Sequence, residues 1–516
     1  MVAALTALRF GGRHLAGHHA RATVLRTPRQ LSPLTACRQC LQSAPRLYRS
    51  VHSSAAAVES NGGSDLRQPL DSFPRRHIGP SPSSTEAMLS VLDPPVKTLD
   101  EFVHQVLPAD ILSAKELGLS APKETTTKLP RDGLHGGLGE SDMIKLFEAY
   151  KKDIDATGRS HIGCGYYGTI VPPVVQRNVL ENPIWYTSYT PYQPEISQGR
   201  LESLLNFQTL TSDLTGLPVA NASVLDEATA AAEAMTMSWA ALPASKQKQP
   251  GKVFVASHLC HPQTLAVMRS RAQGFGINLI VGDVMADDFK LVKEQGEKLI
   301  GVLAQYPDTE GGVYDFQALS DKIHQQGGMF SVATDLLALT VLKAPGEFGA
   351  DIAFGNSQRF GVPMGFGGPQ AAFFACTEKN KRKIPGRIVG VSKDRLGNRA
   401  LRLALQTREQ HIRREKATSN ICTAQALLAN MSAFYAVYHG PKGLKAIAER
   451  TMALTALLKV KLNALGFNVP TRGNIGEDGV AFDTLVIETS SQAEADSLMD
   501  AALESSMYLR RVASSK

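Results

Sequence analysis

The sequence predicts an α/β protein whose central sheet is mixed and mainly parallel, and two observations carry this prediction. Between residues 250 and 356, short apolar segments alternate with amphipathic segments of helical period, which is the pattern of β-α-β units. The apolar segments are continuous rather than alternating, as expected for strands covered by helices on both faces. A helical region is expected before this sheet, and a smaller α+β segment after it.

The elements follow in order along the chain. Three helices are expected in SSTEAMLSVL, TLDEFVHQVLPADIL and ESDMIKLFEAYKKD, and Ser83 with Glu86 predicts a capping box at the first. The expected strands are KVFVAS, INLIVGD, LIGVLAQYP, MFSVATDLLAL and DIAFGN, joined by helices in PQTLAVMRSRAQG, KLVKEQGE and DFQALSDKIHQQG. A long helix, TAQALLANMSAFYAVYHG, comes next, and GVAFDTLVIET with SQAEADSLMDAALESS begins the smaller α+β segment.

The positive charge of the chain is concentrated at its beginning. The formal net charge is +7, but residues 1–58 contain eight Arg, no Lys and no acidic residue. Of 55 Lys and Arg, the remaining 47 face 48 Asp and Glu, a net of −1, so we expect no nucleic-acid surface. An Arg-rich, Ser-rich and acid-free N-terminus is typical of a mitochondrial transit peptide, with a disordered basic tail as the alternative.

Cysteine content and hydropathy set further limits. No stretch approaches the roughly 20 apolar residues that a membrane span needs, so no membrane partner is expected. The leader holds Cys37 and Cys40, and the remaining four cysteines are dispersed along the chain. In a reducing compartment such dispersed thiols are expected to be free rather than paired.

Polar residues at the ends of expected strands form the candidate site. In residues 220–235, Asp226 precedes a long Ala-rich helix, whose start would suit an anion or is simply an ordinary capped helix. After the strand KVFVAS come His258, Cys260 and His261. A metal site there is disfavoured by the spacing, and we expect the imidazole of His261 to lie over a flat ring. Asp335 ends an otherwise apolar strand, so it requires a cationic partner unless it caps a helix or lies at the surface.

The segment GADIAFGNSQRFGVPMGFGGP, residues 349–369, completes this pattern. An anion loop before a helix, a histidine and an aspartate at strand ends, and a strand before a glycine-rich loop resemble the large domain of fold-type I, aspartate aminotransferase-like transferases that use pyridoxal phosphate (PLP). In those enzymes a lysine ends the last strand, and Asp335 would pair with the pyridine nitrogen. Here the slot holds Gln358 and Arg359. Neither can form a Schiff base, so no catalytic residue is expected in this chain.

A more specific resemblance covers the chain from about Arg75 to its end. HIGCGYYGTIVPPVVQRNVLENPIWYTSYTPYQPEISQGRLESLLNFQTLTSDLTGLPVANASVLDEATAAAEAM and QRFGVPMGFGGPQAAFFA resemble glycine decarboxylase, the P-protein of the glycine cleavage system, in a eukaryotic, mitochondrial-matrix form. The resemblance implies an oxidoreductase that decarboxylates glycine with PLP and transfers the aminomethyl group to the lipoyl group of H-protein. The family has two homologous halves, and the chain resembles the N-terminal one, which lacks the lysine.

The resemblance also assigns roles and partners. PLP would be held by the lysine-bearing half or partner subunit, in a homodimer or in a pairing with that half, and T-protein and L-protein would be further partners. Gly365, Gly367 and Gly368 would present amides to the PLP phosphate of the partner half. His261 and Asp335 would be degenerate PLP-site positions. The expected channel for glycine and the lipoyl group, or else a buried interface cluster, comprises Tyr166, Tyr167, Tyr189, Tyr192, Gln193 and Glu195.

The expected domain organisation follows from these assignments. It comprises a transit peptide (1–58), a linker (59–82), a helical N-terminal region (83–160), a PLP-transferase-like large domain (161–440) and the start of a small α+β domain (441–516). Because no lysine in a suitable setting follows, we expect either a truncated product or one subunit of a two-chain enzyme. The alternatives are a non-catalytic scaffold that docks H-protein or the catalytic half, and an independent PLP enzyme of aminotransferase type.

Overall fold

The structure is a computed structural model in which two compact units divide the chain between Ile154 and Asp155. No described helix is long and apolar enough to cross a membrane. The predicted transit peptide and most of the predicted linker lie outside the described residues, as do Cys37, Cys40 and Cys422. The described residues are 79–112, 140–152, 154, 157–187, 193–368, 370–405, 410–418, 421, 425–470, 472–475 and 479–512.

The first unit contains the three predicted N-terminal helices, α4 (Pro82–Ser90), α5 (Leu99–Val106) and α6 (Glu140–Lys152). The predicted capping box at Ser83 is wrong. Ser81 is the N-cap of α4 and accepts a hydrogen bond from the amide of Ser84. The helix begins earlier because Pro82 has a backbone φ suited to the first helical position and has no amide hydrogen to satisfy there.

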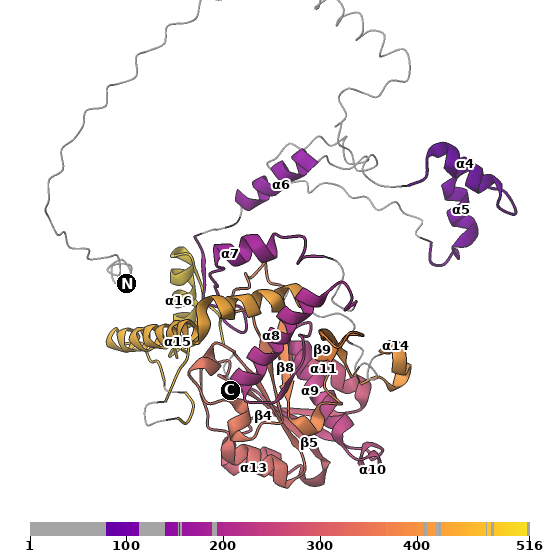
Figure 1. The fold of residues 1–516 in the computed structure, drawn as a ribbon. Helices are drawn as coiled ribbons and strands as arrows, with labels where there is room; N and C mark the ends of the chain where they lie inside the picture. Colours follow the sequence, from indigo (N-terminus) through magenta and orange to yellow (C-terminus); the bar gives the residue numbers. More distant parts are fainter. Residues whose placement is uncertain are drawn as a thin grey trace, which may run out of the picture. The chain divides into compact units, whose positions relative to one another are not determined.

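The second unit is built on a seven-stranded sheet, shown in Figure 1, with the order β2-β8-β7-β6-β5-β3-β4. The five strands from β7 to β4 are parallel, whereas β8 is antiparallel to both of its neighbours. The predicted mixed, mainly parallel sheet is therefore confirmed. The strands are β2 (Val219–Ala220), β3 (Val253–Ser257), β4 (Asn278–Gly282), β5 (Leu299–Tyr306), β6 (Met329–Thr334), β7 (Ile352–Asn356) and β8 (Ala372–Cys376).

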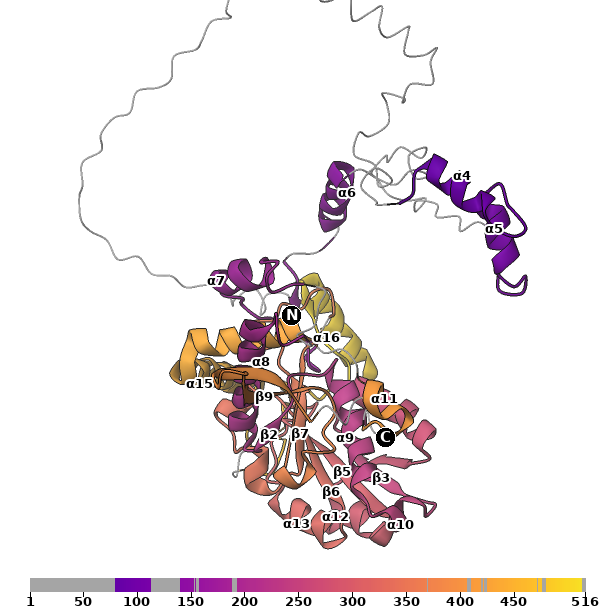
Figure 2. The same cartoon turned by 45° about the vertical axis from the view of Figure 1, so that its right-hand side comes forward.

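Helices cover both faces of this sheet, as Figures 1 and 2 show. On one face lie α9 (Glu227–Ala241) and α11 (Pro262–Phe275). On the other lie α8 (Gln198–Thr215), α13 (Gln317–Gln325) and the first part of α15 (Ala426–Ala464).

Strand β3 shows why the central strands read as continuous apolar runs. Its Val253 and Val255 pack on the side of α8, while Phe254 and Ala256 pack on the side of α9. Successive side chains of a strand point to opposite faces, and here both faces are covered. Each residue must therefore be apolar or hydrogen-bonded. Polar side chains are therefore found mainly where the strands end, and a site can form there.

Smaller elements surround the sheet. Strands β9 (Ile388–Lys393) and β10 (Arg399–Ala404) form an antiparallel hairpin, and β1 (Arg159–Ser160) pairs in parallel with β11 (Met507–Tyr508). The remaining short helices are α7 (Pro173–Val175), the π-helix η2 (Gln176–Leu180), α10 (Ala244–Gln247), α12 (Ala286–Lys293) and α14 (Gln410–Arg413). Short 3-10 turns occur at Gly296–Lys298, Ala338–Thr340, Pro345–Phe348, Glu378–Asn380 and Arg414–Lys416.

The last predicted elements are found in part. Helix α16 (Gln492–Glu504) matches its prediction, whereas residues 480–488 contain only isolated bridges, at Ala481 and Glu488, and no strand. The predicted boundary at residue 440 falls inside α15, at a kink where Gly440 has a φ of 65° and precedes Pro441. The other domain boundaries stay predictions.

Candidate functional site

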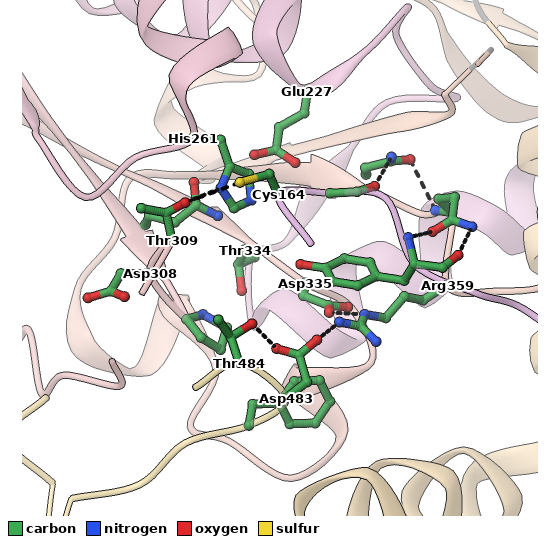
Figure 3. Close-up of a pocket in the computed structure, with 17 residues that line it drawn as sticks. Cys164, Glu227, His261, Asp308, Thr309, Thr334, Asp335, Arg359, Asp483 and Thr484 are labelled. Atoms are coloured by element: carbon green, nitrogen blue, oxygen red, sulfur yellow. Dashed lines mark hydrogen bonds and ion pairs between the residues drawn. The ribbon is translucent and has the colours of Figure 1, made fainter. Parts of the chain in front are cut away.

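The candidate site is a pocket where the carboxyl ends of β5, β6 and β7 meet the first residues of α9 and α11 (Figure 3). Ligands of parallel sheets collect at this edge because the loops after the strands diverge there. Residues 482–484, which follow α15, form another wall. Four carboxylates line the pocket, those of Glu227, Asp308, Asp335 and Asp483. Its cavity volume is about 30 Å³, which is room for about one or two water molecules.

Arg359 provides the cationic side chain among the carboxylates of this pocket. Its Nε forms an ion pair with Asp335, and its Nη2 forms one with Asp483. The guanidinium carbon lies 3.3 Å from the ring centroid of Tyr167, a stacked cation-π geometry. Only 11% of the Arg359 side chain is exposed. The arginine thus lies at the position that the sequence predicts for the missing lysine.

Asp335 has the cationic partner that its position at the end of β6 required, and that partner belongs to the chain itself. Its Oδ1 accepts a hydrogen bond from the amide of Leu337 at 2.9 Å, which closes a turn. The helix-cap alternative is wrong, because the 3-10 turn Ala338–Thr340 has Leu337 as its N-cap and no side-chain cap hydrogen bond. The two carboxylate oxygens therefore serve different functions, one closing a turn and the other balancing Arg359.

Gln358 holds residues 167–169 against the end of β7. Its side-chain amide donates to the carbonyl of Tyr167 at 2.8 Å and to the hydroxyl of Thr169 at 2.9 Å. It also donates to the carbonyl of Val362 at 2.8 Å, and its oxygen accepts from the amide of Tyr167 at 3.2 Å. Because Gln358 is buried and bonded at both ends, its role here is structural.

Glu227 is the first residue of α9 and points into the pocket (Figure 3). The capped-helix interpretation of this segment is confirmed, since Asp226 accepts a hydrogen bond from the amide of Thr229 at 2.7 Å. Burial, followed by the charges of Asp335 and Asp226, raises the pKa of Glu227 to about 8. Its Oε1 has no hydrogen-bond partner within the described structure. A carboxyl group with this pKa is largely protonated at neutral pH.

His261 is buried at the start of α11, where its Nδ1 lies 3.2 Å from the hydroxyl of Thr309. Cys164 reaches the same hydroxyl, with its Sγ at 3.4 Å. Burial, followed by the charge of Arg510, lowers the pKa of His261 to about 4. The imidazole is therefore neutral at physiological pH. The free-thiol expectation is confirmed for Cys164 and Cys260.

Asp308 begins the turn after β5. Its Oδ1 accepts hydrogen bonds from the amides of Glu310 and Gly312, both at 2.8 Å, while its Oδ2 is without a partner in the part of the chain described. Burial raises the pKa of Asp308 to about 6, against the opposing effect of the two amides. The described residues contain no group of three or more His, Cys, Asp or Glu arranged to hold a metal ion.

The other predicted site residues are dispersed. Tyr167 lines the pocket, whereas Tyr166 is half-buried beside it and Gln193 and Glu195 are exposed. Tyr189 and Tyr192 lie outside the described residues.

The glycine loop makes internal hydrogen bonds. The amides of Gly367 and Gly368 donate to the carbonyl of Met364, at 2.9 and 3.0 Å, and the backbone of Gly365 is left-handed, with a φ of 52°.

Sequence reasoning missed three carboxylates of the pocket, Glu227, Asp308 and Asp483. A signal existed for two of them, because Asp308 directly follows an apolar strand and a proline, and Glu227 begins a helix of small residues. Asp483 had no local signal, because its partner Arg359 is 124 positions earlier in the chain.

The strand order, the single antiparallel strand and a pocket at the strand ends define the large domain of a fold-type I PLP-dependent transferase. Comparison with known proteins narrows this class. The family model for the glycine cleavage system P-protein matches residues 75–516, and the chain belongs to that family.

Individual relatives agree with the family assignment. Glycine dehydrogenase (decarboxylating) from Nostoc sp. is 49% identical over 446 residues, covering 86% of this chain and 42% of the relative. The mitochondrial enzyme of Pisum sativum is 50% identical, over 86% of this chain and 39% of its own length. A crystal structure of glycine decarboxylase (P-protein) in inhibitor-bound form is 30% identical, with a TM-score of 0.67, covering 84% of this chain and 91% of that chain. The chain spans about two fifths of the length of these curated relatives.

The pocket of this chain does not fit PLP. The cavity of about 30 Å³ holds one or two water-sized groups, far less than a substituted pyridine ring with a phosphate. Arg359 already pairs with Asp335, the carboxylate that would face the ring nitrogen. Glu227 stands at the helix start where an anionic phosphate would bind. No chemical step through PLP is therefore assigned to this pocket.

Proposed function

We propose that the chain is the lysine-free N-terminal half of a glycine decarboxylase. In this proposal the complete enzyme decarboxylates glycine with PLP and transfers the aminomethyl group to the lipoyl group of H-protein, an oxidoreductase reaction of the glycine cleavage system. PLP is held by a lysine-bearing half, and this chain completes that half's site. The observation that carries the proposal is Arg359, which takes the lysine position and is committed to Asp335 and Asp483.

Surfaces outside the pocket are the proposed contribution of this half. We assign the loop containing Gly365, Gly367 and Gly368 to the PLP phosphate of the lysine-bearing half, and the region of Tyr166 and Glu195 to the channel for glycine and the lipoyl group. The side chain of Phe366, between these glycines, is 96% exposed, and a covering partner would remove this apolar surface from water. H-protein, T-protein and L-protein are the further proposed partners.

A mitochondrial-matrix location is proposed with this function. It is supported by the eight arginines and the absence of acids in residues 1–58 and by mitochondrial relatives from Pisum sativum and Dictyostelium discoideum. Bacterial relatives are equally similar, so the location rests on the leader. Fusing residues 1–58 to a fluorescent protein tests it, and diffuse cytosolic fluorescence would contradict it.

The proposed activity is tested by reconstitution. The chain is mixed with PLP, H-protein and a lysine-bearing half, and exchange of labelled bicarbonate into glycine is measured, with each component omitted in turn. We expect exchange only in the complete mixture, and a borohydride-reduced pyridoxyl adduct only on the lysine-bearing half. Binding of H-protein without exchange in the complete mixture would indicate a scaffold instead.

Channel residues are tested in the same assay. Glu195→Gln is expected to lower the exchange rate, whereas Glu202→Gln, an exposed glutamate on α8, serves as the matched control. Equal rates for both variants would remove Glu195 from the channel.

A further inference from the structure

We propose that Arg359 is an internal replacement for the cofactor: its guanidinium makes the contacts that a bound cationic ring would make, and it fastens residues 482–484 to the end of the sheet. This inference rests on the proposed function in one respect, since both start from the ion pairs of Arg359, but its test measures stability and ion binding rather than glycine exchange.

The first support is the match in shape and charge. A protonated pyridine ring is a flat cation that pairs with a carboxylate at the end of a strand. The Arg359 guanidinium is also a flat cation, it pairs with Asp335 at the end of β6, and its centre lies 3.3 Å from the ring centroid of Tyr167. A guanidinium suits this role because it is planar, permanently charged and able to stack and pair at once. Lysine, a compact point charge, would not reproduce both contacts.

The second support is the use of two carboxylates from distant parts of the chain. Asp335 follows β6, whereas Asp483 belongs to the segment after α15, and Arg359 lies between them. The ring of Phe482 also lies near, with its centroid 5.4 Å from the guanidinium carbon. A single side chain therefore connects the C-terminal segment to the sheet edge, and Figure 3 shows Arg359 and Asp483 pointing toward each other.

The third support is the charge balance. Among the described residues that line the pocket, Arg359 is the only lysine or arginine. It faces Asp335 and Asp483, whose side chains are 15% and 13% exposed. Removing the guanidinium would leave two mostly buried carboxylates without their cation, which is strongly destabilising. The two carboxylates thus require a cation at this position, and the chain supplies it permanently.

The test uses the full chain and thermal unfolding. Arg359→Ala removes the cation and opens space, and Arg359→Met keeps most of the apolar side-chain volume in case the alanine variant does not fold. Arg472→Ala is the matched control, because Arg472 also bridges two acids, Glu310 at 3.3 Å and Glu488 at 3.1 Å, but is 34% exposed. We expect Tm to fall by roughly 5 to 10 °C for the Arg359 variants, and by much less for the control.

Chemical rescue then distinguishes a guanidinium site from ordinary loss of packing. Each protein is unfolded in millimolar guanidinium chloride and in sodium chloride of equal ionic strength. We expect millimolar guanidinium to raise the Tm of Arg359→Ala and to leave that of the wild type and of Arg472→Ala almost unchanged, because only the opened pocket binds the ion. Absence of this rescue in Arg359→Ala, or failure of guanidinium to restore folding where that variant is unfolded without the ion, would overturn the replacement role.

The link to the C-terminal segment has its own test. Asp483→Asn is introduced into the wild type and into Arg359→Met, and a smaller loss of Tm in the second background is expected because its partner is already absent. Equal losses in both backgrounds would overturn the fastening role.

Discussion

The protonated Glu227 makes a quantitative prediction about stability and pH. Its folded-state pKa is about 8, against 4.5 for the ordinary glutamate. Between those values the native state holds a proton that the unfolded state has lost, so stability falls as pH rises through this range. The slope expected for one proton is about 1.4 kcal/mol per pH unit.

The useful window is pH 6.5 to 8, because Glu227 makes the largest contribution of the shifted pocket groups there. Asp308, with a pKa of about 6, gives the same sign of slope as Glu227 but at lower pH. His261, with a folded pKa of about 4 against 6.5, gives the opposite sign, and its contribution fades as pH rises above 6.5, where the unfolded imidazole loses its proton. Burial also raises the pKa of Tyr167, whose ordinary value of 10.0 already lies above the window. Across the window, Glu227 alone should remove roughly 2 kcal/mol of unfolding free energy.

Urea unfolding of Glu227→Gln and of the wild type, at several pH values in this window, measures the effect. The glutamine keeps the size of the side chain and cannot ionise, so its stability relative to wild type should rise by roughly 2 kcal/mol from pH 6.5 to 8. Glu233→Gln is the control, since Glu233 is buried on the same helix but pairs with Arg271 at 2.7 Å. A constant difference between Glu227→Gln and wild type across the window would refute the reasoning.

Three further predictions concern the framework around the pocket. Asp351→Asn should lower the free energy of unfolding by about 2 to 3 kcal/mol in urea, because buried Asp351 pairs with His324 and Lys379 and accepts a hydrogen bond from the amide of Phe330. A loss below about 0.5 kcal/mol, as for an ordinary surface substitution, would contradict this prediction. Gly355→Ala should cost about 3 kcal/mol or more because its Cβ would lie 1.9 Å from the carbonyl of Thr334, whereas Gly168→Ala, with open space around it, should be tolerated. Gln358→Ala should lower the free energy of unfolding by roughly 3 kcal/mol. It should also speed proteolysis near residues 167–169, because the Gln358 side chain forms hydrogen bonds with Tyr167 and Thr169. An unchanged cleavage rate would show that other contacts hold that segment.

The central sheet was predictable because its signal is local. Each of the four inner parallel strands, β3, β5, β6 and β7, is a short apolar run, and a strand buried on both faces needs no other code. The antiparallel β8 and the β9–β10 hairpin were not predicted. The sequence of β8 is AFFAC, and those of β9 and β10 are IVGVSK and RALRLA, two strands that are partly exposed. None of these sequences differs locally from other segments of similar composition.

Of the site, the chemistry was predictable and the partners were not. An aspartate ending an apolar strand must be balanced by a cation, and that requirement for Asp335 follows from burial alone. The identity of the cation depends on which side chains the fold brings to the same edge. Arg359 was noted only as a residue that cannot replace a lysine, although its positive charge is what balances the aspartate.

The order of the residues by itself determined the β-α-β architecture, the missing lysine and the need for a cation near Asp335, because periodicity, side-chain chemistry and burial are properties of short segments. Only the tertiary structure decided that Arg359 meets Asp335 and Asp483 together, that Glu227 is buried enough to keep its proton near neutral pH, and that the remaining cavity is too small for PLP. Those facts depend on how the fold places segments that are separate in the sequence, and electrostatic energies change steeply with the resulting distances and with burial.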